Sequence, residues 1–276
     1  MKSKISEALG MKDIRTVALS WTDVKPQAVL EYKPGKWGCV MWLITAAARG
    51  KVAVASRETV GCYGGGVGLG FGNAYENFPG GVEGFCYFLS IGNEARAGGK
   101  ELAEKVRPYL TAESYDHFLH GERYVKSPAL VEKFIEELPM RDIPARYVVF
   151  KPLDQVRPED EAPKTVIFFV NPDQLSALVI LANYAREGNE NVIIPYAAGC
   201  QTVGIYPYRE GEKEKPRAVV GLTDISARLY TKKQLGSGQL MTFAVPWPMF
   251  LEMEGHVEGS FLERPTWKGL TSSDAG

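Results

Sequence analysis

The stretch TVIFFVNPDQLSALVILANYARE, residues 165–187, joins the pattern of a buried strand to that of a helix. Its first six residues are β-branched or aromatic, which predicts a strand over 165–170. Asn171 can cap a following helix, Pro172 suits its first position, and apolar residues recur at helical spacing over 172–187. A strand followed directly by an amphipathic helix is one half of a parallel-sheet unit, so the stretch predicts an α/β fold.

Further strand and helix patterns lie on both sides of this stretch. Short strands are predicted over 16–21, 51–56, 146–151, 217–221 and 240–245, a buried helix over 40–49 that stops at Gly50, and helices between 99 and 138. We therefore expect one or more mixed sheets with flanking helices. The recurrence of Gly38-Cys39 as Gly199-Cys200 suggests two similar α/β halves, residues 1–145 and 146–267, followed by a flexible tail over 268–276.

Composition narrows the class of protein. The 276 residues include 32 basic and 33 acidic side chains, and no basic block is interleaved with aromatic residues, so no nucleic-acid partner is expected. No apolar stretch approaches the ~18 residues of a membrane span, and the first ten residues lack a secretory signal. We expect a globular cytoplasmic protein, with no membrane partner, whose four cysteines are reduced.

Cysteine placement is the most informative local feature. Cys62 opens a run with six glycines over residues 62–72, and Cys39 and Cys200 also follow a glycine at the boundary of a predicted element. Glycine lets backbone N–H groups approach a ligand closely, and a helix N-terminus beside Cys39 favours its thiolate. Cys86 lies inside an apolar, strand-like run and is the weakest candidate ligand.

Familiar catalytic motifs are missing from the sequence. The glycine run fits neither the dinucleotide fingerprint nor the P-loop, and there is no Cys-x-x-Cys pair, His-Glu-x-x-His helix or Gly-x-Ser-x-Gly elbow. His117 and His120 could share one helix face and hold a metal, but they stand in a polar segment typical of exposed histidines. Nucleotide binding and structural zinc ribbons lose support.

The order of these features resembles that of a prokaryotic family catalogued as domain of unknown function 169. The features are Gly38-Cys39, an Ala-rich helix ending at Gly50, Cys62 with Gly68-Leu69, the strand and helix over 166–175, and Cys200. The resemblance spans residues 15 to 250. It implies a cytoplasmic, anaerobe-associated protein of no established activity, and no catalytic residues to transfer. Relatives carry a late Gly-Cys where this sequence has residues 221–228, and Asp224 is the candidate replacement.

The leading hypothesis is an iron–sulfur cluster, most simply 4Fe-4S, held by Cys39, Cys62 and Cys200, with Cys86 or a non-cysteine group at the fourth iron. The N–H groups of Gly61, Gly64, Gly65 and Gly66 would hydrogen-bond its sulfurs.

The alternatives for the cofactor are zinc in the same site and no metal at all. Two alternatives for function are a non-enzymatic small-molecule or metal carrier using the Gly-rich loop, and thiol or persulfide chemistry at Cys62. A redox partner or a small-molecule ligand is expected; the sequence leaves enzymatic activity and homo-oligomerisation open.

Overall fold

The computed structural model describes residues 1–27, 29–157, 159 and 162–272. The chain divides into two compact units, one made of Met1–Phe71 with Arg141–Gly276 and the other of Gly72–Met140. This division differs from the expected halves meeting at residue 145. The reason is that strands from both sides of residue 145 join one sheet in the first unit.

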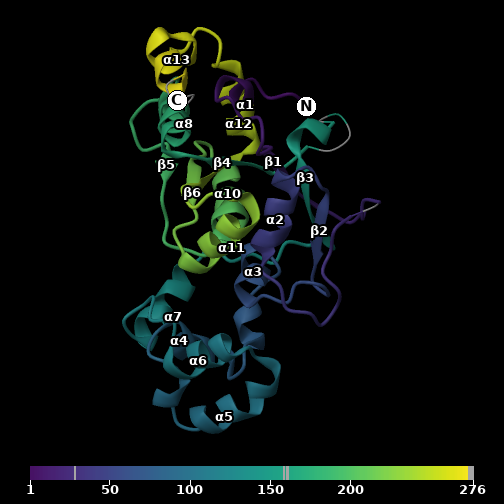
Figure 1. Ribbon diagram of the computed structural model, residues 1–276, viewed down its shortest axis with the longest axis vertical. Helices are drawn as coiled ribbons and strands as arrows, with labels where there is room; N and C mark the ends of the chain where they lie inside the picture. Colours follow the sequence, from purple (N-terminus) through teal and green to yellow (C-terminus); the bar gives the residue numbers. More distant parts are fainter. Residues whose placement is uncertain (28, 158, 160–161, 273–276) are drawn as a thin grey trace. The chain divides into compact units, whose positions relative to one another are not determined.

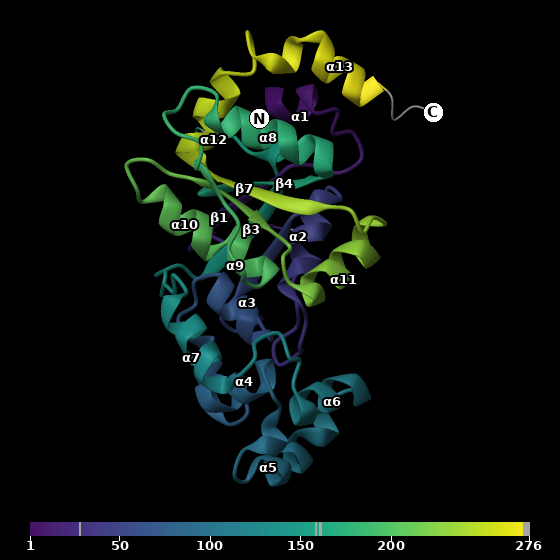
Figure 2. The ribbon, with the colours of Figure 1, turned by 90° about the vertical axis from the view of Figure 1, so that its left-hand side faces the viewer.

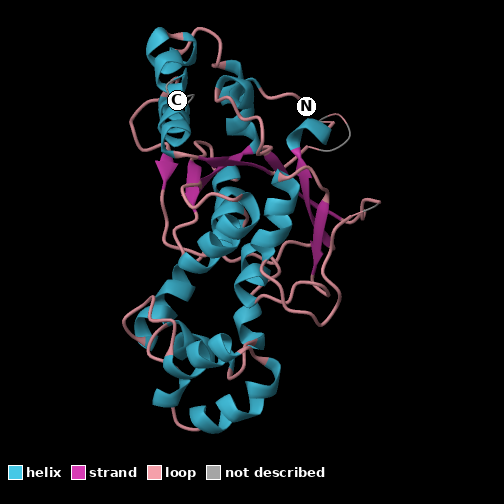
Figure 3. Ribbon diagram, in the orientation of Figure 1, coloured by secondary structure: helices cyan, strands magenta, loops and turns pink. Residues whose placement is uncertain are grey.

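The first unit is built on a seven-stranded sheet in the order β2-β3-β1-β4-β7-β6-β5. Its strands are β1 (Val17–Thr22), β2 (Ala53–Ser56), β3 (Tyr147–Pro152), β4 (Thr165–Val170), β5 (Val192–Ile193), β6 (Ala218–Gly221) and β7 (Met241–Pro246). All neighbouring strands run antiparallel except β5 and β6. The predicted mixed α/β fold is confirmed (Figures 1 and 3).

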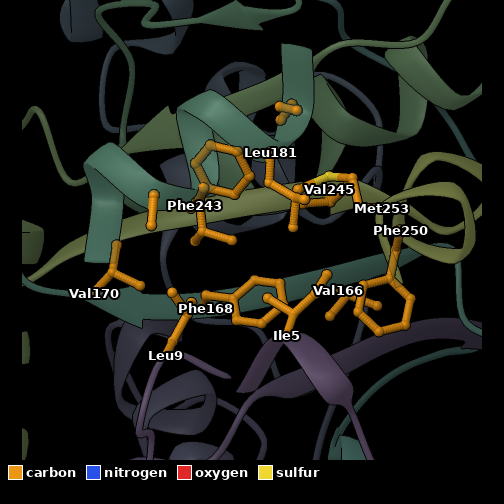
Figure 4. Close-up of a cluster of buried hydrophobic side chains, with 14 of the residues drawn as sticks. Ile5, Leu9, Val166, Phe168, Val170, Leu181, Phe243, Val245, Phe250 and Met253 are labelled. Carbon is orange, nitrogen blue, oxygen red and sulfur yellow. The ribbon is translucent and has the colours of Figure 1, made fainter. Parts of the chain in front are cut away.

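Strand β4 occupies the middle of the sheet, and all six of its residues are buried. Because side chains alternate along a strand, Val166, Phe168 and Val170 share one face, where they pack in a cluster with Phe243 and Phe250 (Figure 4). The expectation of a parallel-sheet unit was wrong. Both neighbours of β4 are antiparallel to it, since a buried strand and its helix carry no signal for the direction of the strands beside them.

Helices cover both faces of the sheet (Figure 2). One layer comprises α1 (Lys4–Ala8), α8 (Pro172–Asn183), α12 (Trp247–Gly255) and α13 (Pro265–Ser272). The other comprises α2 (Val40–Ala48), α9 (Gly199–Val203) and α10 (Ile205–Gly211); α3 (Tyr63–Gly68) packs on α9, and α11 (Ile225–Leu235) packs on α2. No helix in the described part of the chain is long and apolar enough to cross a bilayer.

Helix α8 begins as its sequence predicts. The Asn171 side chain accepts a hydrogen bond from the Gln174 N–H at 2.9 Å, and the Gln174 side chain accepts one from the Asn171 N–H at 3.1 Å, which completes a capping box. The predicted tail differs, because residues 268–272 belong to α13. That helix is anchored by the buried Trp267, whose indole N–H donates to the Ala8 carbonyl at 3.0 Å. Residues 273–276 of the predicted tail lie outside the described residues.

The second unit is helical, as expected for residues 99–138. It contains α4 (Gly81–Leu89), α5 (Gly99–Val106), α6 (Ala112–His120) and α7 (Pro128–Glu137). Its core is a group of ring contacts among Tyr75, Phe78, Phe85, Phe88 and Phe118. The strand-like interpretation of the run around Cys86 was wrong, because that run is the end of α4; a short apolar segment has no periodicity that separates strand from buried helix.

A buried carboxylate ties the N-terminus to the sheet unit. Glu254 on α12 accepts hydrogen bonds from the Ser3 hydroxyl and from the backbone N–H groups of Lys4 and Ile5, at 2.8 and 3.2 Å. It thereby satisfies N–H groups at the start of α1 that have no intrahelical partner. We expect Glu254→Ala to lower the free energy of unfolding by about 1–3 kcal/mol, measured by urea denaturation. Glu258→Ala, which removes an exposed ion pair with Lys4, is the control and should leave the free energy of unfolding nearly unchanged.

Candidate functional site

Cys39 stands at the N-cap of α2, at the boundary the sequence predicts. The glycine before it has a packing reason, because a Cβ on Gly38 would lie 2.2 Å from the ring of Tyr32. The Tyr32 hydroxyl in turn donates to the Cys39 carbonyl at 3.0 Å. Tyr32 therefore positions the start of α2, a role that the sequence alone did not reveal.

Cys62 stands at the N-cap of α3, and its sulfur accepts a hydrogen bond from the Gly65 N–H at 3.4 Å. The Gly-rich segment was expected to be a loop, but residues 63–68 form a helix. Gly61, just before Cys62, packs against the segment that leads to Cys39: an added Cβ would lie 2.4 Å from the Lys36 carbonyl oxygen and 2.8 Å from the Trp37 Cα. This close approach brings the segments preceding Cys39 and Cys62 into contact.

Cys200 is the second residue of α9, and its thiol donates to the Gly64 carbonyl of α3 at 3.3 Å. The two helices are in close contact, since a Cβ on Gly68 would lie 2.8 Å from the Cys200 carbonyl carbon. A Cβ on Gly65 would likewise lie 2.5 Å from a methyl group of Val40 on α2. Gly65 and Gly68 thus allow α3 to approach α2 and α9; a role of Gly61, Gly64, Gly65 and Gly66 in holding a cofactor stays a prediction.

Asp224 joins two of these helix ends. It caps α11, its Oδ1 accepting from the Ala227 N–H at 2.7 Å, and its Oδ2 accepts from the Gly199 N–H at the start of α9 at 2.6 Å. Sequence reasoning noticed Asp224 only as a possible replacement for a cysteine. The Asp-x-x-Ala spacing is a usable N-cap signal, but nothing in the sequence shows that the same carboxylate reaches α9.

Burial dominates the ionisation of these groups and outweighs the helix N-terminus that was expected to favour a thiolate at Cys39. Burial raises the pKa of Cys39 to about 12, and the charges of Cys62 and Asp224 add to this shift. Burial also raises the pKa of Cys200, with further contributions from Cys62, Cys39 and Asp224. The pKa of Asp224 is raised by burial. Thiolates at Cys39 and Cys200 would thus be opposed by burial and by the neighbouring negative charges, which favours the neutral thiols unless a cation joins them.

This arrangement predicts slow alkylation of Cys39 in metal-free protein. A thiol with a pKa of about 12 carries little thiolate at pH 7–9, so iodoacetamide should modify Cys39 about 100- to 1,000-fold more slowly than a cysteine in an unfolded peptide. The rate should keep rising about tenfold per pH unit to pH 10, read by mass spectrometry of the Cys39 peptide. A rate that levels off near pH 8 would contradict the raised pKa.

The remaining candidates lie in the helical unit. Cys86 is buried on α4, and its pKa is raised to about 11 by burial, with additions from Glu132 and Glu83. His120 contacts Glu94 at 2.7 Å and His117 lies 3.9 Å from Glu122. The histidines are thus partly exposed partners of carboxylates, as the polar setting suggested.

A single-ion site is not formed by the described side chains: among residues 1–27, 29–157, 159 and 162–272, no three His, Cys, Asp or Glu residues are grouped as ligands of one metal ion. The described cysteines are all free of disulfides.

Comparison with known proteins identifies a family and nothing more specific. The family model of domain of unknown function 169, described as Uncharacterised ArCR, matches residues 4–256. This range contains all four cysteines and Asp224. No curated protein and no solved structure shows a significant match.

Proposed function

The chain belongs to the family catalogued as domain of unknown function 169, and we propose that it binds an iron–sulfur cluster through Cys39, Cys62 and Cys200. One observation carries the proposal: the three thiols come from the N-terminal ends of three helices within one unit, and α3, which carries Cys62 at its start, packs against both α2 and α9. Thiolates are the usual ligands of such clusters, and we expect the four-iron form.

The local electrostatics support a cationic occupant. Thiolates at these three positions would repel one another, so their formation is favoured when positive charge enters the site, and iron supplies that charge. N-terminal helix ends and the Gly65 N–H beside the Cys62 sulfur also favour thiolate.

Asp224 is the non-cysteine group that we assign to the fourth position. It belongs to the same unit as the three thiols and influences the ionisation of Cys39 and Cys200, whereas Cys86 belongs to the helical unit. A carboxylate holds iron less tightly than a thiolate does, so this position is the one open to a substrate or sulfur ligand. We place the protein in the reducing cytoplasm of an anaerobe, where free cysteines and such a cluster persist.

Anoxic purification tests the proposal directly. We expect a brown protein with about four iron and four acid-labile sulfide per chain, measured together with the electronic and EPR spectra. If the protein contains zinc and no labile sulfide, the site is a zinc–thiolate site and not an iron–sulfur cluster. A colourless protein that contains no iron or sulfide and takes up neither on anoxic reconstitution would refute the cluster.

A second function is supported by the setting of Cys62. Its sulfur is partly accessible and accepts an N–H at a helix N-cap, an arrangement that favours a nucleophilic thiolate or a persulfide carrier. Under this alternative, the intact mass of the protein should show one added sulfur atom at Cys62 after treatment with a persulfide donor. Loss of the adduct in Cys62→Ser, with Cys39→Ser and Cys200→Ser unaffected, would favour it over the cluster.

A further inference from the structure

Large apolar side chains are exposed on three segments next to the thiol site. Trp37, 61% exposed, precedes Cys39, and Ile225 and Leu229 follow Asp224 on α11. Ile194 and Tyr196 stand in the segment that leads from β5 to α9 and Cys200. We call these five residues the apolar rim. The apolar rim contains five of the 13 large apolar side chains that are exposed in the described part of the chain. Exposed apolar side chains are therefore concentrated on the segments next to Cys39, Cys200 and Asp224.

Specific contacts hold the rim together. The ring of Trp37 lies 6.3 Å from the ring of Tyr230 on α11, which joins the segment before Cys39 to that helix. The Thr223 hydroxyl donates to the Pro195 carbonyl at 3.1 Å, which joins the segment before α9 to the start of α11. Along α11, residues 225, 229, 232 and 233 share one face, because helix neighbours recur every three to four residues. That face is exposed, whereas Ala227 and Thr231 on the other side are buried.

The polar surroundings of the rim are basic. Lys33, Lys36, Lys232 and Lys233 are exposed, and none of them forms an ion pair with a described residue. Residues 29–40 and 222–239 contain only two acids. Glu31 pairs with Lys25, and the partly buried Asp224 accepts backbone hydrogen bonds. Unneutralised positive charge therefore flanks Trp37, Ile225 and Leu229, whereas the segment that carries Ile194 and Tyr196 contains no lysine and follows the exposed Glu187 and Glu190.

We propose that the apolar rim and its four lysines dock an acidic electron-carrier protein. An exposed apolar centre with a charged margin is typical of a transient protein interface, and complementary charge raises the rate of encounter. The electron-transfer part rests on the proposed cluster: one electron leaves the carrier, which is oxidised, and enters the cluster, which is reduced, with no bond made or broken. Docking itself requires only the surface.

A plant-type [2Fe–2S] ferredoxin, an acidic carrier, is the probe, and its affinity is measured by isothermal titration calorimetry. We expect the double variant Lys232→Glu/Lys233→Glu to weaken binding at low salt at least tenfold, and Trp37→Ala/Leu229→Ala to weaken it as well. The affinity of the native chain should fall with added salt. The matched control is Lys12→Glu/Lys268→Glu, which makes the same charge change on the opposite side of the sheet and should alter affinity less than twofold.

The outcomes separate the docking surface from the cluster. Cys62→Ser should bind the ferredoxin as the native chain does but accept no electron from its reduced form in stopped-flow experiments. A native protein that takes up no iron or sulfide on anoxic reconstitution, yet still shows lysine-dependent binding, would refute the cluster and support the docking surface. Absent or salt-independent binding, equal loss in the control variant, or a dimer that Trp37→Ala converts to a monomer would overturn the proposed partner.

Discussion

Cys62→Ser is expected to lower the iron content of anoxically reconstituted protein from about four atoms per chain to less than one, with matching loss of labile sulfide. Cys39→Ser and Cys200→Ser should have the same effect. A serine hydroxyl is a poor ligand for iron, and two remaining cysteines cannot retain a four-iron cluster stably. Iron, sulfide and EPR intensity measured on the same preparations give the result.

Loss of the fold would not explain this result. Cys39 and Cys62 are N-cap residues, where serine is among the preferred residues, so α2 and α3 should be as stable or more stable by up to about 1 kcal/mol. At position 200 a serine hydroxyl can donate to the same Gly64 carbonyl that the thiol contacts. Circular dichroism and urea unfolding check this directly.

Cys86→Ser is the matched control, because this buried cysteine lies in the helical unit. It should keep full iron content while losing some stability through burial of a hydroxyl. Equal iron content in all four single variants would instead favour the carrier function, in which the cysteines only pack.

Gly68→Ala is expected to destabilise the fold by about 1–3 kcal/mol and to lower cluster occupancy at the same time. The added Cβ would lie 2.8 Å from the Cys200 carbonyl carbon and from the Gln201 nitrogen. Both are backbone atoms, so the contact can be relieved only by moving α3 and α9 apart, which displaces Cys62 or Cys200. Urea denaturation and iron content measure the two effects.

Gly255→Ala is the control for this prediction. Gly255 ends α12, and an added Cβ there would meet no atom within 4 Å. Alanine also restricts the unfolded chain, so stability should stay equal or rise by up to about 1 kcal/mol. If Gly68→Ala proved as harmless as Gly255→Ala, the close contact between α3 and α9 would not exist in solution.

Local patterns predicted most of the elements because local interactions create them. Strand β4 and the start of α8 follow from a β-branched and aromatic run and from the Asn171 cap, and α2 follows from its apolar run and Gly50. The run around Cys86 was misassigned because a short apolar segment is compatible with either structure. The antiparallel neighbours of β4 were missed because strand direction depends on contacts with residues far along the chain.

The candidate site likewise depends partly on local sequence and partly on contacts between distant residues. The sequence by itself determined the mixed α/β class, the family, and three Gly-Cys pairs at element boundaries, with only Cys39 at the start of a predicted helix, since composition, periodicity and capping are properties of neighbouring residues. Only the tertiary structure decided that Cys200 meets Gly64 on α3, that Asp224 contacts the start of α9, and that Cys86 belongs to another unit. It also decided that the glycine run is a helix packed against α2 and α9. The physical reason is that the meeting of helix ends depends on how the sheet and its helices pack, and this information is spread over the whole chain.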